Sequence, residues 1–246
     1  MLSPKQMTKV VRAVERNCDR FEKDELMPYL ERLHAQKVGS SEKVNSNIAL
    51  QRYVGISSNG MEAMRFSKGV STKVGKTLIQ PMLQDIAGIA GGNSVMAGSG
   101  AVDFMISRNY GSQADANAVL TSAGIPLLGN VPNNNRRLYL VSVKATDSTQ
   151  SGSTVPGAVD KMYAELASRR KEGEVDVVAL FLNMYGTKNR EFPHKKSGNA
   201  YIRCFELSGD ATMQFLTGDR RVAGVVDATL KSHTVSPAIK HLIESL

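Results

Sequence analysis

An acid and a lysine stand in two strand-like stretches of the sequence, and together they could do chemistry. Asp103 lies in the run 98–106, and Lys144 lies near the end of the run 136–146. Both runs cluster aliphatic, β-branched or aromatic residues between Gly, Asn or Arg, which predicts strands of a buried sheet. If these strands are neighbours, Asp103 and Lys144 come together.

The position of Lys144 matters because its segment otherwise has the composition of a buried strand. A buried lysine is costly unless a carboxylate, a phosphate or a metal-bound water satisfies its charge. An acid that binds a divalent cation beside such a lysine suits phosphodiester hydrolysis, because the cation activates water and the lysine orients it. The ordinary alternative is a strand-end aspartate and a lysine whose ammonium group reaches the surface of an α/β core.

The residues Asp103 and Ser142-Val143-Lys144 resemble the signature of the PD-(D/E)XK nuclease superfamily, which includes the type II restriction endonucleases. That signature is an acid on one strand, then acid-x-Lys on the next. Ser142 stands where the family has Asp or Glu, which is a departure from the pattern. The resemblance covers roughly residues 60–185. It implies an α/β, restriction-endonuclease-like fold with a mixed central β-sheet flanked by helices, after a helical N-terminal region.

The resemblance also implies roles for these residues. Asp103 and the Val143 carbonyl would bind Mg²⁺, Lys144 would position the attacking water, and Ser142 would occupy the place of the second acid. The family often adds a glutamate from the helix before the sheet, for which Glu62 is the candidate, although a surface glutamate would look the same.

Two acids could compensate for the serine at position 142. They are Glu62 and Asp147, and either could supply the missing negative charge. A single carboxylate binds Mg²⁺ weakly, so a high metal requirement is expected.

Composition and charge limit the classes of protein to which this chain can belong. The chain has 246 residues with 41% hydrophobic and 22% charged residues, which is typical of one globular domain. It has no run of eighteen apolar residues and no apolar leader after Met1, so we expect a cytoplasmic protein. Cys18 and Cys204 have no zinc-ligand spacing, and Cys18 falls on the apolar stripe of the first expected helix, which favours a core role.

The net charge of +8 and the isoelectric point near 9.5 favour nucleic acid as a partner. Aromatic residues are only 6% and Trp is absent, so contact with double-stranded DNA fits better than stacking on single strands. Side chains that suit base or phosphate contact occur in a polar insertion over 107–137 and in a basic loop after residue 187, although a solvated loop explains the insertion equally well. The candidates are Asn133, Asn134, Asn135, Arg136 and Arg137 in the insertion, and Lys188, Arg190, Lys195 and Lys196 in the loop.

The pattern of elements predicts a single domain over 1–246. Residues 1–70 read as helical, 71–207 as the α/β core, and 208–246 as a helical C-terminal part. Within the core, helical spacing over 159–167 lies between the second strand and a strongly apolar strand over 175–184, and a further strand covers 200–207. Strand, strand, helix, strand is the order expected of the nuclease core. Residues 69–77 approach a phosphate-binding P-loop, but five residues separate the glycines where the motif needs four.

Two functions from different classes fit these observations. The first is a Mg²⁺-dependent endonuclease that cuts double-stranded DNA at a short specific site, as a homodimer that could associate through its N-terminal helices. The second is a non-catalytic nucleic-acid-binding structural protein, such as a phage or viral nucleoprotein. A small-molecule phosphoryl-transfer enzyme is a third option, but no cofactor motif supports it. Metal-dependent cleavage separates the first two.

Overall fold

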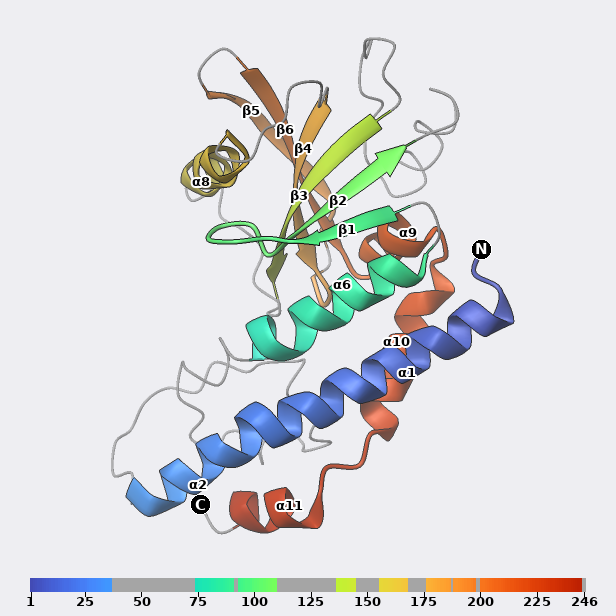
Figure 1. Ribbon diagram of the computed structural model, residues 1–246, viewed down its shortest axis with the longest axis vertical. Helices are drawn as coiled ribbons and strands as arrows, with labels where there is room; N and C mark the ends of the chain where they lie inside the picture. Colours follow the sequence, from blue (N-terminus) through green and yellow to red (C-terminus); the bar gives the residue numbers. More distant parts are fainter. Residues whose placement is uncertain are drawn as a thin grey trace.

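A long amphipathic helix, α1 (Pro4–Phe21), opens the chain and lies along one side of the molecule (Figure 1). The structure is a computed structural model that describes residues 1–36, 74–90, 93–109, 136–144, 155–167, 176–186, 188–197 and 200–244. Ser3 and Gln6 form a reciprocal capping box at the start of α1, which satisfies backbone N–H groups there. The buried stripe of α1 includes Cys18, so the predicted helix and the core role of Cys18 are confirmed.

The helical N-terminal region continues without a break. A short π-helical segment, η1 (Glu22–Leu26), leads directly into α2 (Met27–Gln36), where the sequence predicts a second helix. The predicted helices that follow, and with them Glu62, lie outside the described residues. The chain resumes with a second π-helical segment, η2 (Val74–Ile79), which leads into α6 (Gln80–Ile89). Pro81 lies at the start of α6, next to the junction where the helix changes from π-helical to α-helical hydrogen bonding.

A six-stranded mixed sheet forms the centre of the described structure. Its strands lie in the order β1-β2-β3-β4-β6-β5 (Figure 1). The first three are antiparallel neighbours, β3, β4 and β6 run parallel, and β5 returns antiparallel to β6. Their bounds are β1 (Asn93–Ala97), β2 (Phe104–Asn109), β3 (Arg136–Lys144), β4 (Asp176–Asn183), β5 (Arg190–Ser197) and β6 (Ala200–Ser208).

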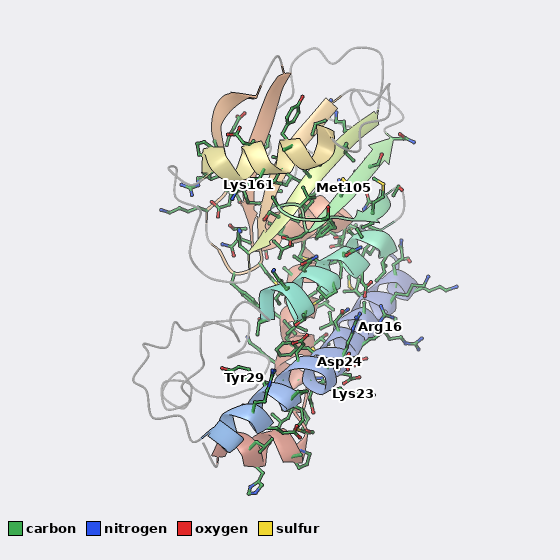
Figure 2. All side chains as sticks on the ribbon, turned by 60° about the vertical axis from the view of Figure 1, so that its left-hand side comes forward. Arg16, Lys23, Asp24, Tyr29, Met105 and Lys161 are labelled. Carbon is green, nitrogen blue, oxygen red and sulfur yellow. The ribbon has the colours of Figure 1, made fainter. Side chains whose placement is uncertain are left out.

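Helices cover both faces of this sheet. On one face, α8 (Val155–Ala167) packs over Leu140 and Phe181, and Met105 in Figure 2 lies on the same side. On the other face, α6 and α9 (Asp210–Thr217) pack over residues such as Tyr139 and Val141, and α1 and α10 (Arg221–Ser232) form a further layer outside α6. The coarse prediction of a mixed α/β fold, with a central mixed sheet flanked by helices, is therefore confirmed, whereas the restriction-endonuclease-like form of this fold stays a prediction.

The order of the central elements also agrees with the sequence. β2, β3, α8 and β4 follow one another as predicted, and the parallel pairing of β3 with β4 across α8 is a crossover connection. The strand expected over 200–207 is β6, and α11 (Pro237–Glu244) is the expected final helix.

Two strands were not predicted. β1 occupies part of a glycine-containing stretch, and β5 occupies the stretch that composition indicated as a basic loop. The polar insertion is also shorter than predicted, because its first residues belong to β2 and its last two, Arg136 and Arg137, begin β3. Residues 110–135 lie outside the described part of the chain.

The chain's first residues are tied to its C-terminal helices. The backbone N–H of Leu2 donates to Oδ2 of Asp219 at 3.1 Å, just before α10 begins. Arg221 pairs with the same carboxylate, with its NH2 nitrogen 2.7 Å from Oδ2. Asp219 thus links the first residues of the chain to the start of α10 through one buried side chain.

Candidate active site

The turn between β1 and β2 positions Asp103. Gly98 donates its N–H to the Asp103 carbonyl at 3.2 Å, and Val102 donates to the carbonyl of Ser99 at 3.0 Å. A Cβ on Gly98 would collide with the carbonyl of Val102, and Gly100 has a φ of 61°, a left-handed conformation that favours glycine. The two glycines therefore let the chain reverse tightly just before Asp103.

Backbone bonds fix Asp103 against the end of β3. Its N–H donates at 2.8 Å to the carbonyl of Val141, the β3 residue that pairs with Phe104 at the start of β2. Its side-chain Oδ2 accepts the N–H of Val143 at 2.6 Å. Gln80 of α6 donates its side-chain amide to the Asp103 carbonyl at 3.0 Å. The aspartate is thus held by β3 on one side and by the helix on another.

The end of β3 presents Ser142 and Lys144 beside this aspartate. Alternate residues of a strand share a face, so both side chains stand on the α8 face with Leu140. Ser142 is buried and Lys144 is half-buried, with its Nζ 5.9 Å from the centre of the Phe181 ring. The structure thereby places Asp103, Ser142, Val143 and Lys144 together.

Burial raises the pKa of Asp103 above its ordinary value. The Val143 N–H opposes this shift, as do the positive charges of Lys144 and Lys76 and a hydrogen bond from Ser142. The carboxylate therefore lies where water is partly excluded, and the positive charges of two lysines from different elements favour its charged form through space. Such perturbed acids are common at functional sites, although ion pairs of purely structural importance also perturb them.

Lys76 is the residue of this site that sequence reasoning missed. It lies on η2, one turn before Gln80, and its side chain is exposed. In the sequence, Lys76 belongs only to an imperfect P-loop motif over residues 69–77. Lys76 comes near Asp103 because η2 packs against β3. A single sequence contains no signal for such a tertiary contact.

A second polar group lies farther along the same face of the sheet. Ser142 pairs in register with Phe181, Phe181 with Glu206, and Glu206 with Arg190 of β5. Glu206 is fully buried and accepts a hydrogen bond from Nε of Arg190 at 2.9 Å. The guanidinium of Arg190 also lies 4.5 Å from the centre of the Phe192 ring. Sequence reasoning selected Arg190 but not Glu206.

The other predicted DNA contacts divide into three groups. Arg137 is only 2% exposed, so its guanidinium lies beneath the surface that a ligand would touch. Lys188 is exposed just before β5, and Arg190 is partly exposed. The structure describes the backbones of Arg136, Lys195 and Lys196 within strands, and Asn133, Asn134 and Asn135 lie outside the described residues.

The oxygen atoms at this point suit Mg²⁺, which prefers hard oxygen ligands and keeps several waters. The Asp103 carboxylate, the Ser142 hydroxyl and the Val143 carbonyl supply them. A strand residue directs its N–H and C=O to the same neighbouring strand, so the Val143 carbonyl points to the side of Asp103. The described ranges contain no group of three or more His, Cys, Asp or Glu side chains that could hold a metal. Glu62 and Asp147 lie outside those ranges.

Comparison with known proteins does not assign this chain to a family. No protein-family model matches the chain, and a search of curated proteins found no significant match.

Among the helices that the structure describes, none combines the length and apolar character needed to cross a membrane.

Proposed function

We propose that this chain is a metal-dependent endonuclease that hydrolyses phosphodiester bonds of double-stranded DNA, on a restriction-endonuclease-like fold. The observation that carries the proposal is the hydrogen bond from Val143 to Asp103, because it places an acid beside a lysine at the ends of two adjacent strands. The order β2, β3, α8, β4 supports the same proposal, as does the net charge of +8.

In this proposal the chain's own residues bind and orient the phosphate. Lys144 directs its ammonium group to the attacking water or to a non-bridging oxygen, and Phe181 packs beside its stem. The Val143 N–H holds the carboxylate of Asp103 in one orientation. Mg²⁺ held by Asp103 and the Val143 carbonyl would supply Lewis acidity and lower the pKa of water. Ser142 offers a hydroxyl where a second carboxylate would stand.

Lys188 and Arg190 extend the positive surface toward the β5 edge, where they would contact DNA phosphates. We further propose cleavage at a short specific site by a homodimer, because two-fold symmetric proteins match two-fold symmetric sites. Sedimentation of the protein with and without a duplex tests the dimer.

The decisive variant is Asp103→Asn, which keeps an oxygen that can accept the Val143 N–H but removes the charge. We expect cleavage of plasmid DNA at low salt with Mg²⁺ or Mn²⁺ to fall about 100-fold or more, because one metal-binding carboxylate is lost. DNA binding measured by gel retardation should remain. Asp19→Asn, at an exposed position of α1, is the matched control and should cleave normally.

One observation favours the non-catalytic alternative, a nucleic-acid-binding structural protein. Ser142 cannot replace the charge of a second acid, and the described residues hold no group of three or more His, Cys, Asp or Glu side chains that could bind a metal ion. If wild-type protein retards duplex DNA but leaves it intact with every metal tried, this alternative replaces the nuclease proposal. Cleavage that persists in Asp103→Asn would instead show that the active site lies elsewhere.

A further inference from the structure

Asp103 is approached by two lysines that come from different parts of the fold. Lys144 is the last residue of β3, and Lys76 lies on η2, which packs against that strand. Gln80, one helical turn after Lys76, donates to the Asp103 carbonyl at 3.0 Å and so holds this helix against the aspartate. The position of Lys76 is therefore set by a direct contact between its helix and the site.

The lysines do not simply neutralise the aspartate. None of the ion pairs formed between described residues joins Asp103 to Lys76 or to Lys144. Instead, the carboxylate directs Oδ2 to a backbone N–H. Both lysines therefore act on the Asp103 carboxylate through space and not through an ion pair, so their positive charge is available to an anionic ligand.

The two lysines differ in how far they are exposed to solvent. Lys144 is half-buried beside Phe181, whereas Lys76 is exposed at the rim. The Lys76 ammonium group is free to meet a ligand that arrives from solvent.

We propose that Lys76 contacts the same phosphate group as Lys144, as a second cation at the Asp103 site. This inference rests on the proposed function, because it identifies a further residue that binds the DNA substrate there. Lys144 contacts the phosphate from the sheet, and Lys76 contacts it from η2. The two side chains together fix the position of the phosphate over Asp103.

The test combines binding and cleavage for Lys76→Ala and Lys76→Arg. Binding of a fluorescent duplex is measured in EDTA over a range of salt concentrations, so that cleavage cannot interfere. Loss of one phosphate contact should reduce the slope of log K against log salt by about 0.9 in Lys76→Ala. Single-turnover cleavage with Mg²⁺ should slow by about 10- to 100-fold. Lys76→Arg keeps the charge and should restore the slope.

Lys240→Ala provides the control. Lys240 is exposed on α11, which lies far from the sheet at the opposite end of the molecule in Figure 1. The control should leave both slope and rate unchanged. An unchanged slope and rate in Lys76→Ala would overturn the inference, and so would an equal loss in Lys240→Ala.

The result also separates this inference from the nuclease proposal. If wild-type protein cleaves with metal and Lys76→Ala behaves like wild type, only the inference about Lys76 fails. If wild-type protein never cleaves, the nuclease proposal fails, and the salt slope in EDTA alone decides whether Lys76 contacts phosphate.

Discussion

Glu206 is fully buried, and its carboxylate lies 2.9 Å from Nε of Arg190. A buried ion pair stabilises a fold little compared with an apolar pair, but an unpaired buried charge is strongly destabilising. We expect Arg190→Met to lower the free energy of unfolding by about 3 kcal/mol, because the buried Glu206 carboxylate then loses its ion pair with Arg190. Urea denaturation measures this change.

The double variant Arg190→Met with Glu206→Leu is the companion experiment, since it removes both charges together. It should recover most of the lost stability. A double variant as unstable as Arg190→Met alone would show that the lost packing of these side chains, and not the broken ion pair, determines stability at this position.

Among single residues, the sequence was informative where a charged side chain stands in a segment that otherwise has the composition of a buried strand. Lys144 drew attention because it stands in an apolar strand, and Asp103 because it stands at a strand start. The structure places both side by side, whereas their catalytic roles remain predictions. Lys76 and Glu206 could not be selected, because each becomes notable only through a partner distant in sequence.

At the scale of elements, the turn over residues 98–103 depends on a glycine. Gly98→Ala would force a Cβ against the Val102 carbonyl, so the turn must open and Asp103 must move away from Val143. We expect a lower melting temperature and, on the proposed function, at least about a tenfold loss of cleavage, because a 1 Å displacement of a catalytic group is costly.

Gly224→Ala is the matched control for this substitution. Gly224 is exposed within α10, and a Cβ there meets nothing within 4 Å. Alanine is the better helix former, so stability should rise by about 0.5–1 kcal/mol. Thermal unfolding of the two variants side by side should therefore give shifts of opposite sign, and equal destabilisation would contradict the steric argument.

The strands that sequence reasoning found and missed differ in their surroundings. β2, β3, β4 and β6 have neighbours on both sides and carry apolar runs that bury against helices, which periodicity detects. β1 and β5 are the outermost strands of the sheet. β1 is short and mostly exposed, and β5 contains Pro193 and several charges, so neither has the composition of a typical strand.

At the scale of the whole molecule, Asp219 links the first residues of the chain to the start of α10. A hydrogen bond from Arg221 is the largest of the effects that hold the pKa of Asp219 well below its ordinary value, and the N–H of Leu2 contributes to the same shift. Because the folded state favours the charged form, this stabilisation is present above about pH 4 and is lost as the pH falls toward the lower, folded-state pKa.

Asp219→Asn should therefore destabilise the protein in a pH-dependent way. We expect a loss of about 2 kcal/mol at pH 7, because charge-assisted hydrogen bonds are replaced by weaker ones. The difference from wild type should shrink when urea denaturation is repeated near pH 3. A difference that stays constant with pH would mean that the carboxylate's charge is not responsible.

The outer edge of β5 has a consequence for how copies of this chain could assemble. An exposed strand edge is a template for pairing with another chain, and proteins block such edges with bulges, prolines and lysines. The pairing of β5 with β6 shifts register between Phe192 and Lys195, and this interval contains Pro193, which has no N–H to offer. Continuous intermolecular sheet formation through the outer edge of β5 is therefore disfavoured.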